Sequence, residues 1–479
     1  MTTIPVVVKH SGKKYNVDLD PEENGLTFKM QLYSLTGVPP ERQKILTKGG
    51  QLKDDSDLKK FNIKPNHAFI MLGTAGELPK APEEPVKFIE DMSDHQIARV
   101  SKNPSGIVNL GNTCYMNSSL QALRSIPEIK DNLKKYRSNN IDLTDELKAL
   151  YASMEGTSQS AIPAAFLSSL RNRLPQFAET DDTGHYKQQD AEEFWTQLLG
   201  ILKDSLREGG DSVVDKYLSG SLDVEMKTDE APEEAPSKRS EVFTKLNCHI
   251  SNGTNYLKDG LLAGLTDTLE KNSETLGRNA EYKVTKKITR LPKYLTVQFV
   301  RFYWRRDTQK KSKILHRVAF PQELDVTDLC SDELKKKIIP VREKLQEIRK
   351  EEEDARRSAK KARFDPSLLV NGQRPDPITE EKKAEYRAEV DKVIDESLKN
   401  DEGNNPSALY ELTAVVTHKG ANADSGHYKC YVRNDQEEGK WWRFDDDKVS
   451  LIDESKIETL AGGGESDSAL IVLYRAADV

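Results

Sequence analysis

Cysteine is scarce in this chain of 479 residues. There are four cysteines, Cys114, Cys248, Cys330 and Cys430, and no two of them form a Cys-x-x-Cys pair. Disulfide-stapled folds and cysteine-rich zinc sites both need closely spaced cysteines. The spacing argues against both, and we expect no metal site and no cofactor.

Long apolar runs and a positive net charge are also missing. No stretch of about 18 apolar residues occurs that could cross a membrane, and the first residues lack the apolar segment of a secretion signal. The formal net charge is −7, so a phosphate-binding surface is not the default expectation. We expect a cytoplasmic protein with access to the nucleus left open, a monomer when free, and no membrane or nucleic-acid partner.

The chain does contain a thiol at the predicted start of a helix. Small polar residues give way at Cys114 to apolar residues at helical spacing, from Tyr115 to Leu123. A helix N-terminus presents unpaired backbone N–H groups, which favour the nucleophilic thiolate. Asn112 or Thr113 would cap this helix, and the side-chain amide of Asn109 could bind a developing oxyanion. The alternative is that the thiol is a small buried apolar group.

A thiol nucleophile also needs a base, and a suitable histidine lies near the other end of the chain. A strand-like segment and a loop precede the sequence Ser-Gly-His-Tyr, in which Gly426 would let a substrate approach the backbone beside His427. A run of aspartates follows Phe444. The hairpin would return one of these acids to the imidazole, where it would hold the correct tautomer.

Five sequence blocks, taken in order, resemble the ubiquitin-specific protease family. They are Gly-Asn-Thr-Cys-Tyr-Met-Asn at 111–117, Gln-Gln-Asp-Ala-Glu-Glu-Phe at 188–194, Leu-Pro-Lys-Tyr-Leu-Thr-Val-Gln-Phe at 291–299 with Arg301 and Phe302, Gly-His-Tyr at 426–428, and Phe-Asp-Asp-Asp at 444–447. The resemblance implies an α+β fold, with a papain-like protease domain over residues 104–479 built from a helical thumb, a sheet palm and β fingers. The family often holds a zinc in the fingers with two cysteine pairs, of which only Cys248 remains here, so no zinc is expected.

The resemblance also implies the roles of the catalytic residues. Cys114 would attack the terminal glycine carbonyl of ubiquitin, and His427 would handle the proton. Asp445 would orient the imidazole by its motif position, with Asp446 as the alternative that local spacing cannot separate. Asn109 and the backbone N–H of Cys114 would stabilise the oxyanion.

A further set of residues would bind the ubiquitin tail. Its members are Gln188, Asp190, Glu193, Gly426 and Tyr428. Asp190 and Glu193 lie three residues apart and share one helix face, so they could hold the arginine of a Leu-Arg-Gly-Gly tail. Two acids near a helix N-terminus are also explained by the helix dipole alone.

Residues 1–75 resemble ubiquitin, which implies a β-grasp domain. Strands are expected at 4–9 and 13–19, and a helix at 26–36 that carries Phe28, Leu32 and Leu35. The chain after Leu72 has no terminal Gly-Gly. This domain therefore cannot serve as a conjugation tag as it stands.

One face of the ubiquitin-like domain is expected to bind a receptor. By alignment, Leu46, Ile70 and Leu72 fall on the face that ubiquitin presents to its receptors, and the alternative is that some of them belong to the core. A proline-bearing, acidic segment at 76–103 follows and is expected to be a flexible linker.

Two charged insertions interrupt the protease domain. The segment 223–240 is acidic, contains proline, and is expected to be a disordered loop. In the segment 331–404, apolar residues from Leu334 to Ile348 repeat at helical spacing over only two heptads, which is too short to claim a coiled coil. Its basic stretch at 356–363 is expected to be solvated, with nuclear localisation as the alternative reading.

The domain order resembles the proteasome-associated members of this family. The resemblance implies that the ubiquitin-like domain docks on the proteasome regulatory particle, and that loops near 304–313 and 420–425 restrain the free enzyme. The main alternative is a catalytically weak regulator that binds ubiquitin at the proteasome. A hydrolase of another ubiquitin-like modifier is the third possibility.

Overall fold

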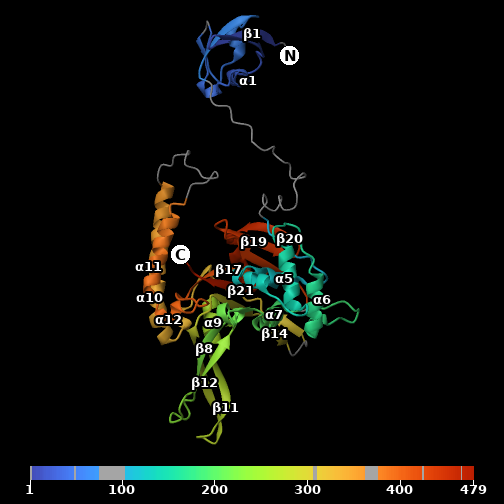
Figure 1. Ribbon diagram of the computed structural model, residues 1–479, viewed down its shortest axis with the longest axis vertical. Coiled ribbons are helices and arrows are strands. Elements are labelled where there is room, and N and C mark those ends of the chain that lie inside the picture. Colours follow the sequence, from blue (N-terminus) through green and yellow to red (C-terminus); the bar gives the residue numbers. More distant parts are fainter. Residues whose placement is uncertain are drawn as a thin grey trace. The chain divides into compact units, whose positions relative to one another are not determined.

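The chain divides into two compact units, Met1–Asp91 and Met92–Val479. The computed structural model describes residues 3–47, 50–74, 103–305, 310–361, 376–422, 425–464 and 466–478 (Figure 1). The linker predicted at 76–103 lies outside the described residues except for Asn103.

The first unit has the β-grasp fold that was expected. Its strands form one sheet in the order β2-β1-β5-β3-β4, in which β1 and β5 run parallel. The elements are β1 (Ile4–His10), β2 (Lys13–Leu19), α1 (Gly25–Thr36), β3 (Lys44–Thr47), β4 (Gly50–Leu52) and β5 (His67–Leu72), with 3-10 turns at Pro40–Arg42 and Leu58–Phe61. Phe28 and Leu32 of α1 are buried against the sheet, whereas Leu35 is 48% exposed. Leu35 lies in the last helical turn, outside the cluster of core residues.

A group of helices forms one side of the second unit. They are α3 (Cys114–Arg124), α4 (Pro127–Lys135), α5 (Leu143–Ser153), α6 (Ala164–Arg173), α7 (Ala191–Ser205) and α8 (Val213–Tyr217). Helix α3 is buried from Cys114 to Leu123 and contacts both α7 and the sheet strand β18. The ring of Tyr115 packs against Phe177 and Phe194, each with ring centroids 5.8 Å apart. The helix that begins at the thiol is therefore the central element of this layer.

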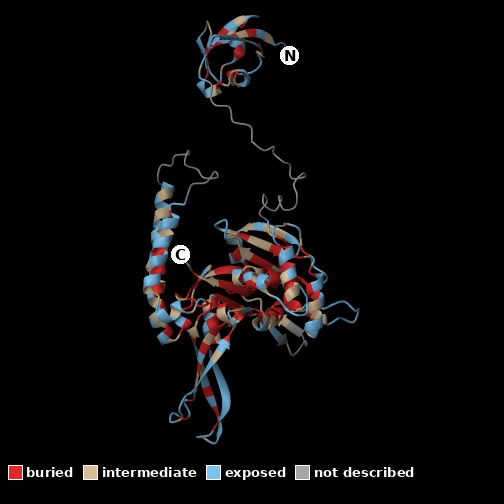
Figure 2. Ribbon diagram, viewed as in Figure 1, coloured by how far each residue is buried: buried red, intermediate tan, exposed pale blue. Residues whose placement is uncertain are grey.

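The central sheet of the second unit has eight strands. Seven follow the order β10-β13-β21-β17-β18-β19-β20, and β16 pairs with β17. Their bounds are β10 (Leu246–His249), β13 (Tyr294–Val300), β16 (Glu323–Asp325), β17 (Leu409–Lys419), β18 (His427–Arg433), β19 (Lys440–Asp445), β20 (Lys448–Asp453) and β21 (Ser468–Ala476). Buried residues gather in this sheet and in the helices against it (Figure 2).

A second, four-stranded sheet extends from the central one. It has the order β11-β12-β8-β9 and consists of β8 (Gly220–Lys227), β9 (Ser237–Phe243), β11 (Thr266–Ser273) and β12 (Arg278–Arg290), with α9 (Leu257–Gly264) at its base. The expected disordered loop at 223–240 was wrong, because β8 pairs with both β12 and β9 across this segment. The acids between the strands have partners too: Lys283 pairs with Asp229, and Tyr282 donates to Glu234 at 2.7 Å.

The second insertion forms helices, drawn in orange in Figure 1. They are α10 (Asp332–Lys361), α11 (Glu380–Val393) and α12 (Glu396–Lys399). The helix α10 continues through Pro340, and its buried residues are Leu334, Ile338, Val341, Leu345 and Ile348. Leu334 and Ile338 pack in a core cluster with residues of the central sheet. Val341, Leu345 and Ile348 pack in a second cluster with Tyr386 and Val390 of α11, which are also buried. The basic stretch lies partly outside the described residues, beyond Lys361.

Candidate active site

Cys114 is the first residue of α3, as the sequence predicts, and it is 3% exposed. Thr113 occupies the capping position, but its side chain does not cap the helix. Its hydroxyl instead accepts from the amide of Leu110 at 3.0 Å and donates to Asn109 Oδ1 at 3.2 Å. The expected side-chain cap was therefore wrong, because this hydroxyl holds the turn that leads into the helix.

His427 is the first residue of β18 and faces two other members of the predicted triad. Its Nε2 atom lies 2.6 Å from Asp445 Oδ1. The thiol of Cys114 hydrogen-bonds the same imidazole. Since Nε2 is occupied by Asp445, the other ring nitrogen is the one available to the thiol. Residues 114, 427 and 445 thus come together from a helix and two strands.

The electrostatics of this cluster favour a protonated imidazole. The hydrogen bond with Cys114, together with that to Asp445 and against the opposing effect of burial, raises the pKa of His427 from 6.5 to about 9. Burial acts to raise the pKa of Asp445, but the hydrogen bond from His427 and the charge of Lys429 hold it below 3.8. An imidazolium between a thiol and a carboxylate is the arrangement that a thiolate nucleophile needs.

Asp446 lies beside the triad and is held in a different way. Its Oδ2 atom is 4.0 Å from His427 Nε2, so it does not hydrogen-bond the imidazole. Asn109 Nδ2 donates to Oδ2 at 2.9 Å, and Asn117 Nδ2 donates to Oδ1 at 2.8 Å. The geometry favours Asp445 over Asp446 as the orienting carboxylate. Asn109 keeps a second N–H, so this contact leaves its expected oxyanion role open.

Asn117 is a site residue that sequence reasoning missed. It is 2% exposed and lies one helical turn after Cys114 on α3. A buried amide needs a partner, but α3 also buries Ser118, Ser119 and Gln121, so polarity alone does not single out Asn117. The partner of Asn117 is Asp446, which is distant in the sequence and could not be identified from the local pattern.

The backbone ahead of α3 packs closely on the turn that follows Asp445. The amide of Ile107 donates to the carbonyl of Asp446 at 3.0 Å. A Cβ atom added at Gly106 would lie 2.6 Å from the carbonyl oxygen of Asp447. Glycine is therefore required where the helical layer meets the sheet, and this seam fixes the thiol relative to the histidine.

Three of the predicted tail-binding residues, Gln188, Asp190 and Glu193, lie at or just before the start of α7. The other two, Gly426 and Tyr428, lie on either side of His427 in the sequence. Asp190 caps α7 through its Oδ1 atom, which accepts from the amide of Glu192 at 2.9 Å, and Glu193 is half-buried in the first turn of the helix. Gln188 is half-buried, and its Nε2 atom has no hydrogen-bond partner among the described residues. Gly426 has φ +125° and precedes the catalytic histidine.

The side chain of Tyr428 is buried and is not accessible to a binding partner in this conformation. It is 1% exposed, and its ring packs edge-on against His418 with centroids 4.7 Å apart. Residues alternate between the two faces of a strand, so Tyr428 points into the core where its neighbour His427 points outward. Direct contact between Tyr428 and a ubiquitin tail does not fit this burial.

The two segments predicted to gate the cleft are joined to each other. Strands β14 (Phe302–Arg305) and β15 (Lys310–Lys313) form a hairpin, and Ser312 forms a β-bridge with Asn422. The amide of Lys313 also donates to the carbonyl of Ala421 at 3.0 Å. Residues 306–309 and 423–424 lie outside the described parts of both segments.

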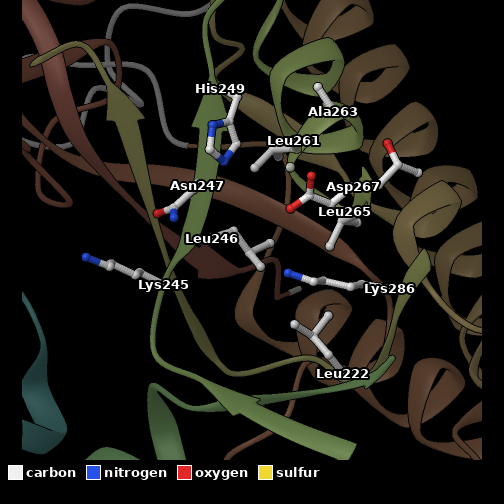
Figure 3. Close-up of a pocket in the computed structure, with 12 residues that line it drawn as sticks. Leu222, Lys245, Leu246, Asn247, His249, Leu261, Ala263, Leu265, Asp267 and Lys286 are labelled. Atoms are coloured by element: carbon white, nitrogen blue, oxygen red, sulfur yellow. The ribbon is translucent and has the colours of Figure 1, made fainter. Parts of the chain in front are cut away.

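A separate cavity of about 270 Å³ lies where the four-stranded sheet meets α9 (Figure 3). Its polar lining includes Lys245, Asn247, His249, Asp267 and Lys286. None of the predicted catalytic or tail-binding residues lines it. Lys245 also pairs with Glu192 of α7, and the nearby charge of Asp190 favours its protonation against the effect of burial, which lowers the pKa of Lys245.

Among the described residues, potential metal ligands come together at one place. One group of three side chains places its potential ligand atoms within 4.8 Å of one another, and it consists of His427, Asp445 and Asp446. These are the residues already engaged with one another and with Cys114, and we assign no ion to them. No helix in the described parts of the chain is long and apolar enough to span a membrane.

The predicted receptor-binding residues lie on one exposed face of the first unit. Leu46 pairs with Ile70 across β3 and β5, and Leu72 follows on the same face of β5. They are 39%, 51% and 53% exposed, while the alternating residues Ile45 and Met71 are buried. The alternative that these leucine and isoleucine side chains belong to the core is therefore wrong.

Two protein families match the two units. The model of the ubiquitin carboxyl-terminal hydrolase family matches residues 105–474, and that of the ubiquitin family matches residues 6–75. A protein named ubiquitin carboxyl-terminal hydrolase 6 from Schizosaccharomyces pombe is 46% identical over 99% of both chains. A protein of the same name from Arabidopsis thaliana is 41% identical over 96% of both chains.

A relative from an animal also matches nearly the whole chain. Ubiquitin carboxyl-terminal hydrolase 14 from Caenorhabditis elegans is 34% identical over 99% of this chain and 94% of its own length. These matches cover the residues that carry the thiol, the histidine and the carboxylate. The chain therefore belongs to the ubiquitin carboxyl-terminal hydrolase family, and it is a cysteine-type deubiquitinase with an N-terminal ubiquitin-like domain.

Proposed function

We propose that this enzyme uses Cys114, His427 and Asp445 to cleave the bond after the C-terminal glycine of ubiquitin, on substrates held by the proteasome. The observation that carries the catalytic part is the chain of contacts from the thiol through the imidazole to the carboxylate. Asp445 lies 2.6 Å from His427 Nε2, and Cys114 hydrogen-bonds the same ring.

The chemistry follows from the raised pKa of His427. The imidazole takes the thiol proton, and the thiolate of Cys114 attacks the glycine carbonyl carbon to form a tetrahedral oxyanion. The amide of Cys114 and the second N–H of Asn109 donate to that oxyanion. His427 then gives its proton to the departing lysine amine, which leaves a thioester. Water, deprotonated by His427, hydrolyses the thioester and restores the thiol.

The tail of ubiquitin would bind along the start of α7. Asp190 and Glu193 offer carboxylates to the arginine of a Leu-Arg-Gly-Gly tail. The buried Nε2 atom of Gln188, which has no partner among the described residues, is a donor suited to a backbone carbonyl of the bound tail. These assignments favour ubiquitin over modifiers whose tails lack arginine.

The ubiquitin-like domain would bring the enzyme to the proteasome regulatory particle. Its support is the exposed face that contains Leu46, Ile70 and Leu72, together with the domain order that resembles proteasome-associated members of the family. In the free enzyme, the bridge between Ser312 and Asn422 would hold the two loops over the tail cleft. Docking would release them.

The test is hydrolysis of a fluorogenic ubiquitin C-terminal amide, with and without purified proteasomes. We expect turnover that requires Cys114 and rises when proteasomes are added. Cys114→Ala should abolish turnover, whereas Cys248→Ala removes a thiol buried in another core cluster and should retain it. Turnover by Cys114→Ala equal to that of the wild type would contradict the triad.

A pair of variants tests the docking face. Ile70→Glu places a charge in the exposed patch, and Leu35→Glu is the matched control because it is similarly exposed on α1 of the same domain. Loss of a central apolar anchor costs about 2 kcal/mol or more, or roughly thirtyfold in affinity. We expect Ile70→Glu alone to lose the stimulation by proteasomes. Equal stimulation of both variants would refute docking through this face.

A further inference from the structure

Lys313, the last residue of β15, is a buried lysine that the proposed mechanism does not use. It is 6% exposed. Its Nζ atom donates to the carbonyl oxygen of His418 at 2.5 Å, and its backbone amide donates to Ala421 at 3.0 Å. A buried ammonium group is costly unless it makes hydrogen bonds. The acceptors of these two bonds lie at the end of β17 and in the turn that precedes His427.

His418 is the residue that receives this contact, and it is fully buried. Its Nε2 atom lies 3.2 Å from the carbonyl oxygen of Ser425. A carbonyl only accepts, so Nε2 carries the hydrogen, while Nδ1 has no partner among the described residues. The ring also packs edge-on against Phe302 of β14 and Tyr428 of β18. His418 therefore contacts both the β14–β15 hairpin and the turn that precedes His427.

Gly426 continues the path from His418 to the catalytic histidine. Its φ is +125°, and a Cβ atom there would lie 2.7 Å from His418 Nε2 and 2.2 Å from the carbonyl oxygen of Lys419. The backbone at this point lies directly on the buried imidazole. Because His427 is the next residue, a shift of His418 would move the backbone that carries the catalytic ring.

We propose that Lys313 is a positioning residue for His427, acting through the carbonyl of His418 and through Gly426. This inference rests on the proposed function of the triad. Lys313 touches neither substrate nor the reacting atoms. Its ammonium fixes the end of β17, and the contacts of His418 and Gly426 transmit that position to the imidazole.

The surrounding charges are consistent with a lysine held for its hydrogen bond. Burial, with repulsion from Arg301 and against the attraction of Asp467, lowers the pKa of Lys313 to about 8. Burial and the nearby charges of Lys313 and His427 lower the pKa of His418 to about 4. At neutral pH the path thus contains a charged lysine and a neutral histidine.

The experiment compares Lys313→Met, which keeps the chain length and removes the donor, with Lys419→Met, which changes the exposed last residue of β17. Hydrolysis of the fluorogenic ubiquitin amide gives kcat and KM. A displacement of about 1 Å can cost on the order of a hundredfold in rate, so we expect Lys313→Met to lower kcat by roughly 10- to 100-fold with KM changed less than about threefold. Wild-type kcat in a folded Lys313→Met protein would overturn the proposal.

A second readout does not depend on ubiquitin. Iodoacetamide alkylates the thiolate of Cys114, and Cys114→Ala serves as the blank for the other three cysteines, whose thiol pKa values are raised by burial. A displaced His427 stabilises the thiolate less, so the midpoint pH of alkylation should rise in Lys313→Met and stay unchanged in Lys419→Met. An identical profile in Lys313→Met and the wild type would overturn the proposal. A wild-type enzyme that is alkylated at low pH but does not cleave would refute the proposed function and leave this comparison valid.

Folding is checked by tryptophan fluorescence. If Lys313→Met does not fold, Lys313→Gln, which retains an N–H donor on a shorter side chain, is measured in both assays. We expect a smaller loss of kcat in that variant and a smaller shift of the alkylation midpoint. Wild-type values of both in a folded Lys313→Gln protein would overturn the positioning role.

Discussion

Asp446 braces the two sides of the catalytic cleft, and its removal should be measurable as a loss of stability. It accepts from Asn109 on the turn before α3 at 2.9 Å, and from Asn117 on α3 at 2.8 Å. Its side chain is 9% exposed. The bond from Asn117 is part-buried, whereas the bond from Asn109 is exposed and is screened more by solvent. Asp446→Asn is the suitable perturbation, because asparagine has the same shape and tolerates the φ of +54° found there.

The magnitude follows from the two hydrogen bonds. A hydrogen bond to a charged group contributes about 1.5–3 kcal/mol, and a neutral one about half as much. The substitution turns one acceptor oxygen into a donor facing another donor, and makes the remaining bond neutral. Asn117 Nδ2 retains a contact with the carbonyl of Ile107 at 3.2 Å. We therefore expect the free energy of unfolding to fall by roughly 2–4 kcal/mol.

Urea unfolding followed by tryptophan fluorescence measures this loss. The four tryptophans, Trp195, Trp304, Trp441 and Trp442, all lie in the second unit, so the ubiquitin-like domain does not contribute to the signal. Asp447→Asn is the matched control, since the next aspartate is exposed. It should change stability by less than about 0.5 kcal/mol.

A double-mutant cycle with Asn117→Ala isolates the contact. Residues that share a hydrogen bond show coupling of about 0.5–3 kcal/mol, whereas independent sites add within about 0.5 kcal/mol. We expect coupling of at least about 1 kcal/mol between positions 446 and 117. Additive effects, or a loss for Asp446→Asn no larger than for Asp447→Asn, would refute the brace.

Four further outcomes are expected. Asp445→Ala removes a hydrogen bond that raises the pKa of His427, so kcat should fall by roughly 10²- to 10⁴-fold and the alkaline limit of kcat/KM should move to lower pH. In the wild type, the pKa of His427 is about 9 in the folded protein. The protonated ring therefore stabilises the fold fully below pH 6.5, and this stabilisation is lost as the pH rises through about 9. Thermal unfolding measured across pH 6–10 checks this dependence. Gly426→Ala places a Cβ atom 2.2 Å from a backbone carbonyl oxygen, so kcat should fall at least about tenfold. The control is Gly111→Ala, where φ is +97° but the space around the residue is open, and it should reduce kcat less. Equal losses of kcat in the two variants would contradict the steric argument. Gly260→Ala would bring a Cβ atom within 2.3 Å of a buried sulfur between α9 and β10, and we expect thermal unfolding to shift down by several degrees, corresponding to about 1–3 kcal/mol; an unchanged midpoint would contradict it.

Local pattern predicted much of the fold and half of the site. The change from small polar to apolar residues at Cys114 predicted the start of α3, and Gly426 with the following alternation predicted the start of β18. The apolar spacing from Leu334 to Ile348 predicted the buried face of α10. These features repeat over one or two turns or a few strand residues, so neighbouring positions are sufficient to specify them.

Composition misled where strand pairing decided the structure. The acidic segment 223–240 was expected to be disordered, yet β8 lies between β12 and β9. Backbone hydrogen bonds on both sides of β8 and ion pairs to the intervening acids stabilise it. The partners of β8 in β9 lie only 11–23 positions further along the chain, but those in β12 lie 56–69 positions away, outside any local window.

The identity of the orienting carboxylate also depended on the tertiary structure and not on local pattern. Motif position preferred Asp445, but the alternative Asp446 remained equally close in sequence. The two side chains leave the turn in different directions, and only the folded hairpin places one at 2.6 Å and the other at 4.0 Å from His427 Nε2. Asn117 then takes the second acid.

The sequence by itself determined the residue types of the catalytic set, the elements that carry Cys114 and His427, and the two-unit organisation. Tertiary structure alone decided which acid faces the imidazole, which amide holds its neighbour, and that Lys313 lies beneath the turn of the catalytic histidine. The physical reason is that helix and strand patterns are set by adjacent residues, whereas hydrogen bonds between residues hundreds of positions apart exist only after the layers have packed.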